Sequence, residues 1–418
     1  MPIMKLRLLT LLLVIPTWIN AQKMVLKAAH LFDGMEMHKD FALLIEGNTI
    51  VEVGDFLSLR PKGDTILDFG NKTLMPGMIE GHSHVLLYPY DITSWDDQVL
   101  KESRSLRAIR GAQMAGRQLM AGFTTVRDLG SEGAQYADVA IKRSIEQGIV
   151  PGPRMIVAGR AIVATGSYGP RGFNPDVTVP LGAQEGDGEH LRTIVREQIS
   201  NGADVVKVYA DYRTGPHGEP MPTFSLEELK LIVETAASTG RRVVAHASTV
   251  EGMRRATLAG VYTIEHGTNA TEEILELMKE RGVAICPTLE ATRAIASYNE
   301  DWDGISMPEP FMVQEKREMF KKVLKSGVTI ISGGDVGVFP HGENARELVL
   351  MASYGMDNDK VLQTATSTNA RVLGLEHLGS LKPGFLADII VVNGNPMEHI
   401  EDLHKVDFVM KDGVIYKS

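Results

Sequence analysis

Two histidines stand two residues apart in the apolar run Met78-Ile-Glu-Gly-His-Ser-His-Val85. Successive side chains of a β-strand point to opposite faces, so a strand here would turn the imidazoles of His82 and His84 to the same side. Two neutral imidazoles on one face can bind one metal ion. An isolated His-x-His pair is about as often a pair of hydrogen-bonded histidines, so the metal interpretation depends on further ligands.

Further candidate ligands occur in similar settings downstream. Each lies in, or at the carboxyl end of, an apolar strand-like run that a helical pattern follows. They are Lys207 in 204–209, His246 at the end of 242–246, His266 at the end of 261–266, and Asp335 after 328–334. Alternating strands and helices with polar residues at the carboxyl ends of the strands are typical of the active site of a (β/α)8 barrel. The spacing therefore predicts an α/β protein with a TIM barrel.

The middle of the chain supplies the strand and helix patterns that such a barrel needs. The expected strands are 78–84, 124–129, 154–158, 204–209, 242–246, 261–266, 283–288 and 328–335. A helix is expected from about 100 to 120, and the capping box Ser225-Leu-Glu-Glu228 predicts the start of another. Gly260, Gly282 and Gly327 follow helical runs, as helix-ending glycines do.

Both ends of the chain are rich in short β-like runs. Gly47-Asn48 and Asp412-Gly413 each separate two such runs, which predicts two hairpins. We therefore expect residues 22–76 and 376–418 to form the two parts of one small β-sandwich domain, with the barrel, 77–375, inserted between them.

Composition and the first residues bear on location and partners. The chain has 418 residues, 44% of them hydrophobic, and a net charge of −10 without a basic patch, which argues against nucleic-acid binding. In residues 1–21, Lys5 and Arg7 precede the apolar run 8–15, and Ala21 offers a small residue for cleavage. We expect a cleaved signal peptide, export to the periplasm or the extracellular space, and no membrane anchor. Cys286 is the single cysteine, which excludes an intrachain disulfide and suggests a buried thiol.

Several motifs, taken in order, resemble the amidohydrolase superfamily. The resemblance is to its imidazolonepropionase-like branch, which contains metal-dependent dipeptidases and carboxypeptidases of the Xaa-Pro and Xaa-Arg/Lys types, and it covers nearly the whole mature chain. The motifs are 76–84, 204–211, 244–249, 263–267, 333–342 and 382–388.

The resemblance implies a site for two divalent metal ions, which the nitrogen and oxygen donors suggest are zinc. His82, His84 and Asp335 would hold one ion, and His246 and His266 the other. A lysine ammonium group has no lone pair to offer a metal. In binuclear members of the family, the lysine at the position of Lys207 reacts with CO2, and the resulting carbamate bridges the two ions. The alternative for Lys207 is a buried lysine paired with an acid.

The expected reaction is hydrolysis of an amide bond in a dipeptide or at a peptide C-terminus. Two ions sharing a water lower its pKa, so that hydroxide is available for attack, and Asp335 can act first as general base and then as general acid. One alternative is hydrolysis of another amide, a lactam or a cyclic imide at the same site. An alternative of another class is a non-catalytic binding protein that has kept the barrel.

Polar residues near the expected mouth of the barrel are candidates for contact with a small-molecule or dipeptide substrate. Hydroxyl, imidazole and guanidinium groups could bind a peptide carboxylate or a carbonyl oxygen, although a surface or packing role is as plausible for each. These candidates are Tyr168, Tyr209, Tyr212, Arg213 and His341. The sequence leaves the oligomeric state open, a homo-oligomer included.

Overall fold

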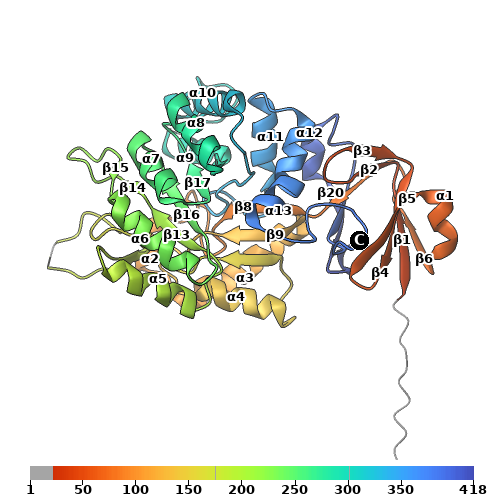
Figure 1. Cartoon of the computed structure of the whole chain (residues 1–418), viewed down its shortest axis with the longest axis horizontal. Helices are drawn as coiled ribbons and strands as arrows, with labels where there is room; N and C mark the ends of the chain where they lie inside the picture. The colour runs from red at the N-terminus through yellow and green to blue at the C-terminus, as the bar shows by residue number, and fades with distance from the viewer. Residues whose placement is uncertain (1–21, 175, 301) are drawn as a thin grey trace, which may run out of the picture.

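The computed structural model describes residues 22–174, 176–300 and 302–418. The expected signal peptide, 1–21, lies outside the described residues. A large α/β region and a smaller β-rich region lie side by side, and the C-terminus lies in the smaller one (Figure 1). No helix in the described part of the chain is both long and apolar enough to cross a membrane.

The α/β region is built on parallel strands in two sheets, with the orders β10-β9-β8 and β12-β11-β13-β16-β17-β18. Their core strands are buried almost throughout, as expected for parallel sheets covered by helices. The strands are β8 (Met78–Ser83), β9 (Phe123–Asp128), β10 (Arg154–Val157), β11 (Ile162–Val163), β12 (Gln184–Glu185), β13 (Val206–Tyr209), β16 (Val243–Ala247), β17 (Thr263–His266) and β18 (Ala284–Cys286). A small antiparallel pair follows β13, with β14 (Asp211–Tyr212) and β15 (Met221–Pro222).

The expected eighth strand, 328–335, lies between β18 and β8 but is not a regular strand. It forms isolated parallel bridges from Ile330 to Ile285 and from Val336 to Ser83. The positive φ of Asp335, 62°, turns the backbone out of the extended conformation at its end. The gap between β10 and β13 is crossed by a hydrogen bond from the amide of Asp204 to the carbonyl of Val157 (2.8 Å). The arrangement is of the TIM-barrel type, with irregular pairing at these places.

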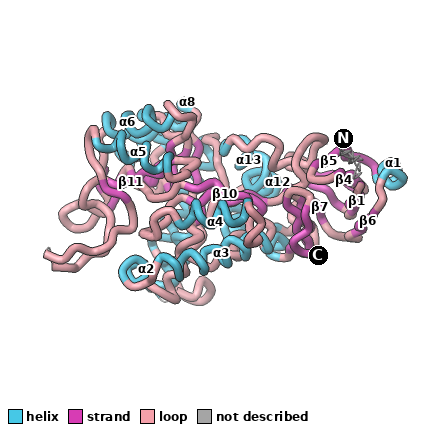
Figure 2. The backbone as a smooth tube through the Cα atoms, turned by 90° about the horizontal axis from the view of Figure 1, so that it is seen from below, coloured by secondary structure: helices cyan, strands magenta, loops and turns pink. Residues whose placement is uncertain are grey.

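Helices surround these strands (Figure 2). They are α2 (Trp95–Leu100), α3 (Arg104–Met120), α4 (Ala137–Glu146), α5 (His190–Ser200), α6 (Leu226–Ala237), α7 (Val250–Ala259), α8 (Glu272–Arg281), α9 (Leu289–Glu300), α10 (Phe311–Ser326), α11 (Ala345–Ser353), α12 (Asn358–Gln363) and α13 (Asn369–Leu373), with a π-helical turn at Thr364–Thr368. The capping box at Ser225 opens α6 as predicted. Gly260, Gly282 and Gly327 end α7, α8 and α10 in the left-handed conformation, also as predicted.

The β-rich region joins the two parts of the chain that flank the barrel. Its sheets have the orders β5-β4-β1-β6 and β21-β20-β19-β7-β2-β3. The strands are β1 (Lys23–Lys27), β2 (His30–Phe32), β3 (Met37–Lys39), β4 (Phe41–Glu46), β5 (Thr49–Asp55), β6 (Thr65–Asp68), β7 (Thr73–Pro76), β19 (Ile389–Val392), β20 (Val406–Lys411) and β21 (Val414–Lys417). Short helical turns α1 (Phe56–Leu59), η1 (Arg60–Lys62) and η3 (Ile400–His404) connect them.

Strands from the N- and C-terminal segments are direct neighbours in the six-stranded sheet. β7 pairs with β19 in antiparallel register, Pro76 opposite Ile389, and with β2 in parallel. One hydrophobic cluster contains Leu43 of the four-stranded sheet together with Leu74 and Phe408 of the six-stranded sheet. Both predicted hairpins are present, as β4–β5 and β20–β21.

Candidate active site

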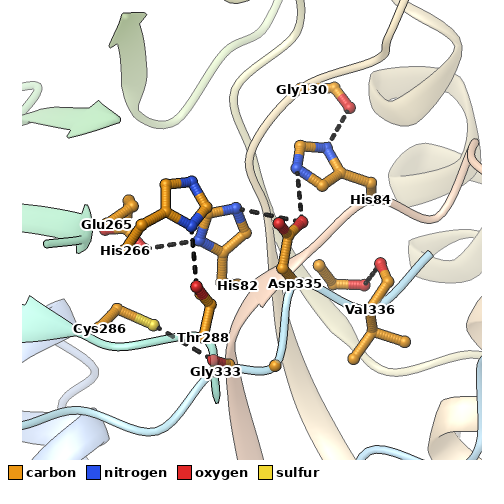
Figure 3. A network of polar contacts seen from close by, with 12 residues as sticks. His82, His84, Gly130, Glu265, His266, Cys286, Thr288, Gly333, Asp335 and Val336 are labelled. Carbon is orange, nitrogen blue, oxygen red and sulfur yellow. Dashed lines mark hydrogen bonds and ion pairs between the residues drawn. The ribbon is translucent and has the colours of Figure 1, made fainter. Parts of the chain in front are cut away.

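Four histidines converge at the carboxyl ends of the barrel strands. The ring centroid of His82 is 5.3 Å from that of His84 and 5.3 Å from that of His266, and the centroids of His246 and His266 are 4.5 Å apart. The rings of His82 and His84 are turned toward the carboxylate of Asp335 (Figure 3). The structure therefore brings these five sequence-predicted residues together in one place.

The geometry of His82, His84 and Asp335 suits a divalent metal ion. The Nε2 atoms of His82 and His84 lie 3.5 and 3.3 Å from Oδ1 of Asp335, and one ligand atom from each residue lies within 4.8 Å of the others. Their Nδ1 atoms are engaged elsewhere, with Oε2 of Glu265 (2.7 Å) and the carbonyl of Gly130 (2.9 Å). Nε2 of His82 is buried without a hydrogen-bond partner among the described residues. Such an orphaned nitrogen, oriented by a second partner on the same ring, is typical of a metal ligand.

Protonation in this cluster favours metal binding. Burial, together with the charge of Lys207, lowers the pKa of His82 to about 4 and that of His246 to about 3, so both imidazoles are neutral at pH 7. Burial acts to raise the pKa of Asp335, but the neighbouring imidazoles of His82 and His84 lower it to about 2, which keeps the carboxylate ionised. Against burial, the hydrogen bond to Asp335 raises the pKa of His84 to about 9. The proton that the raised pKa of His84 implies lies between His84 and Asp335, where a metal cation can replace it.

Lys207 lies in β13, 1% exposed, and its charge lowers the pKa of His82, His246 and His266. Among the described residues, no carboxylate oxygen lies within 4.0 Å of its Nζ, so Lys207 makes no direct ion pair of the kind that the alternative interpretation requires. Burial lowers the pKa of Lys207. Because only an unprotonated amine can attack CO2, this lowering suits the carbamate that the family resemblance implies.

A cavity of about 960 Å³ opens above the histidines. Tyr168, Tyr209, Tyr212 and Arg213, the residues proposed from the sequence as substrate contacts, line this cavity. The ring of Tyr209 stacks on His246, with centroids 4.6 Å apart and an interplanar angle of 14°. The guanidinium of Arg213 is exposed at the rim. The cavity is large enough to bury a small-molecule substrate.

Comparison with known proteins identifies the family. The model of the "Amidohydrolase family" matches residues 73–416. The chain belongs to the amidohydrolase family. It is therefore a hydrolase of the TIM-barrel type.

The similar proteins include an ochratoxinase, a dipeptidase and a prolidase. Ochratoxinase of Aspergillus niger is 29% identical over 97% of this chain and 89% of its own length. The crystal structure of a Xaa-Pro dipeptidase with bound methionine has a TM-score of 0.83 at 31% identity, covering 95% of this chain and 100% of that one. A prolidase complexed with N-methylphosphonate-L-proline has a TM-score of 0.81 at 30% identity, with 95% and 100% coverage.

The sequence analysis did not identify two buried charged residues of this amidohydrolase that support the site, Glu265 and Arg127. Glu265, in β17, contacts Nδ1 of His82 and also accepts hydrogen bonds from Arg127 (3.0 Å) and Thr263 (2.6 Å). Burial acts against its charge, but Arg127 and His82 hold the pKa of Glu265 well below its usual value. The pair fixes the tautomer and orientation of His82, as a carboxylate behind a metal-binding histidine does. A charged residue inside an apolar strand was the sequence feature that could have revealed them.

A third buried residue with an ionisable side chain, Glu80, connects the two segments that carry His82, His84 and Asp335. It accepts hydrogen bonds from the amides of His82 (3.0 Å) and Gly334 (2.9 Å) and from Nδ2 of Asn344 (2.9 Å). β8 and the loop before Asp335 are thereby held at a fixed separation.

His341 does not lie where the sequence analysis expected. It is absent from the residues that line the cavity above the histidines. It lies behind His84, with Nε2 placed 3.2 Å from the carbonyl oxygen of His84, and it lines a separate cavity of about 1000 Å³ beside α3. The backbone turn at Gly337, with φ of 123°, redirects the chain after Asp335 and carries His341 away from the mouth. Its contact makes it a candidate for positioning His84 instead.

Proposed function

We propose that this amidohydrolase is a binuclear, zinc-dependent enzyme that hydrolyses an amide bond in a dipeptide or at a peptide C-terminus, with Xaa-Pro and Xaa-Arg/Lys substrates foremost. The observation that carries the proposal is the convergence of four histidines and Asp335 beside the buried Lys207. The similarity to a Xaa-Pro dipeptidase and a prolidase over nearly the whole chain supports the choice of substrate class.

The residues fit two metal ions in defined roles. His82, His84 and Asp335 would hold one ion and His246 and His266 the other, with a carbamate on Lys207 between them. When bound, the ions would lower the pKa of a water molecule and polarise the scissile carbonyl. Thr288 hydrogen-bonds Nδ1 of His266 (2.8 Å) and so keeps Nε2 of that ring available.

Asp335 would move the proton. Its carboxylate is ionised at neutral pH and lies at the edge of the cavity. It would accept a proton from the attacking water and then deliver it to the leaving amine, acting as general base and then as general acid. Tyr168, Tyr209, Tyr212 and Arg213 would orient the substrate, with the exposed guanidinium of Arg213 suited to a carboxylate.

A second candidate is hydrolysis of a different amide, a lactam or a cyclic imide at the same site, in a substrate that carries an aromatic group. The aromatic rings that line the cavity, and the similarity to an ochratoxinase, favour it. The two candidates differ in whether the scissile amide bond joins two amino acids.

The test is metal analysis and substrate screening of the enzyme produced with zinc and bicarbonate. We expect about two ions per chain and hydrolysis within a dipeptide library. Lys207→Ala should lose one ion and most of the activity, with partial rescue by short carboxylic acids. Lys230→Ala, an exposed lysine on α6, is the matched control. Full activity and metal content in Lys207→Ala would refute the binuclear proposal.

We also propose export through the signal peptide at residues 1–21, to the periplasm or the extracellular space. The mature protein recovered from its native host should begin at or near Gln22. N-terminal sequencing that finds Met1 retained would contradict this proposal.

A further inference from the structure

A buried glutamate that no step of the proposed reaction uses lies in the wall of the catalytic cavity. Glu132 follows β9 in a loop, has a φ of 47°, and is 3% exposed. Its Oε2 accepts hydrogen bonds from Nε1 of Trp95 (2.9 Å) and from the hydroxyl of Tyr168 (2.5 Å). Both donors are neutral, so they stabilise the carboxylate without cancelling its charge.

No lysine or arginine in the described part of the chain pairs with this carboxylate. The nearest candidate is Nδ1 of His84, 3.9 Å from Oε1, and that nitrogen already contacts the carbonyl of Gly130. Arg107 approaches Glu132 but donates to its backbone carbonyl (2.6 Å). His84 belongs to the metal-binding set, and apart from it no cationic side chain among the described residues lies within ion-pair distance of this carboxylate. A buried charge balanced so incompletely is costly, so its retention in a cavity wall points to a partner that arrives with the substrate.

Aromatic rings complete the surroundings of Glu132. The centroid of Tyr168 lies 5.1 Å from that of Trp95, 4.9 Å from that of Tyr209 and 4.9 Å from that of Tyr212. All four rings line the same cavity as Glu132. Faces of tyrosine and tryptophan attract cations, and the attraction is stronger where water is excluded.

We infer that Glu132 and these four rings form a binding subsite for an ammonium group of the substrate. The carboxylate supplies the counter-charge and a hydrogen-bond acceptor, and the rings supply cation–π contacts. The subsite rejects substrates that place a carboxylate or an uncharged acyl cap there. The reaction in which this subsite takes part rests on the proposed function, whereas its preference for an ammonium group over a neutral group does not.

The first experiment measures binding without catalysis. Zinc-loaded enzyme is titrated calorimetrically at pH 7 with 2-phenylethylamine, which is a cation at this pH, and with 2-phenylethanol, its neutral counterpart. We expect the amine to bind about 10- to 100-fold more tightly. In Glu132→Gln, whose amide oxygen can still accept from Trp95 and Tyr168, the ratio should fall to about one while the zinc content is unchanged.

Two results of this titration would overturn the inference. One is equal binding of the two probes by the unchanged enzyme. The other is a preference for the amine that survives in Glu132→Gln, since the amine would then owe its affinity to another group, such as the metal. Glu276→Gln, an exposed glutamate on α8, is the matched control and should keep the preference.

The second experiment identifies the source of the ammonium group. Initial rates are compared for Ala-Pro, N-acetyl-Ala-Pro and N-acetyl-Lys-Pro. Selective loss of kcat/KM for Ala-Pro in Glu132→Gln assigns the subsite to the N-terminal ammonium, and selective loss for N-acetyl-Lys-Pro assigns it to a side chain. An equal loss for all three substrates would show a purely structural role and overturn the inference. If the unchanged enzyme cleaves none of them yet prefers the amine in the titration, the proposed function fails and the subsite stands.

Discussion

Two buried glutamates lie behind the His82–His84 pair, Glu265 against His82 (2.7 Å) and Glu132 near His84 (3.9 Å), and they differ in how their charge is balanced. Glu265 lies in a strand and has an arginine, a threonine hydroxyl and the ring of His82 as partners. Glu132 lies in a loop, and among the described residues its carboxylate accepts hydrogen bonds from two neutral donors, with Nδ1 of His84 farther away at 3.9 Å. The charge of the first carboxylate, Glu265, is balanced within the protein, so its role is to support the site. The second carboxylate, Glu132, has no such strong partner, and by our inference an ammonium group of the substrate supplies the balancing charge.

The same difference separates the whole floor of the cavity from its wall. The floor consists of residues at or near strand ends, whose positions are fixed by the barrel. The wall includes the aromatic residues Trp95, Tyr168, Tyr209 and Tyr212, which lie outside the metal-binding set. Residues of this kind at the mouth of a barrel can change with less effect on the fold. Changes in the floor should therefore reduce turnover or metal binding, and changes in the wall should alter substrate choice.

The largest loss of activity is expected on changing Asp335, the carboxylate in the floor that would transfer the proton. Asp335→Asn removes the general base and one metal ligand, so turnover should fall by about 10²- to 10⁴-fold. Steady-state kinetics with a dipeptide, combined with metal analysis, measures both consequences. Turnover close to that of the unchanged enzyme would show that the proton moves elsewhere.

A smaller effect is expected for the support beneath the metal ligands. Glu265→Gln leaves His82 without its charged partner and Arg127 buried without a counter-charge, so zinc affinity or activity should fall by about 10- to 100-fold. Competition with a chelator measures the affinity, and thermal unfolding measures the stability. Combining the change with Arg127→Met should restore part of the stability, because the buried unpaired charge is then removed. Additive losses in the double variant would contradict the pairing.

His341→Ala tests the role of a side chain that the sequence analysis placed at the substrate cavity and that the structure places behind His84. It removes a hydrogen-bond partner of the His84 backbone, so zinc affinity should weaken by about five- to tenfold, the effect of one hydrogen bond. The relative rates among dipeptides should stay the same. A changed dipeptide preference with unchanged zinc affinity would return His341 to substrate recognition.

The smallest effect is expected in the wall. Tyr212→Phe keeps the ring and removes one hydroxyl, so KM should rise by about two- to fivefold for dipeptides while zinc content and kcat stay nearly constant. Comparing dipeptides with different C-terminal residues measures any change in preference. Loss of zinc in this variant would remove the distinction between floor and wall.

The sequence predicted the floor better than the wall for a physical reason. Strand ends in a barrel meet at one edge, so His82, His246 and His266 could be placed from local patterns alone. Like Lys207, Arg127 and Glu265 each appear in the sequence as a charged residue within an apolar strand. Their roles could be inferred only from the contact between them, which the sequence does not show. The role of Glu132 depends on Trp95, at the start of α2, and on Tyr168, in a distant loop, and no local sequence pattern contains these contacts.

Backbone direction was the other quantity that patterns did not supply. The run 328–335 has a strand-like composition, but a left-handed residue ends it at Asp335, and the eighth strand is irregular. The turn at Gly337 then places His341 behind the metal ligands. Both outcomes depend on φ angles at single residues, which an apolar or polar pattern does not encode.

The neighbouring positions of β7 and β19 have a consequence for biosynthesis. While the chain is being made, β7 has its parallel neighbour β2 available, but its antiparallel neighbour is synthesised only after the entire barrel. Until then a nascent chain presents an open sheet edge, which is a site for chaperone binding or for aggregation. A product truncated before Ile389 retains that edge permanently. Cellular proteases and chaperones can thus distinguish incomplete copies from finished enzyme by a feature of the sheet.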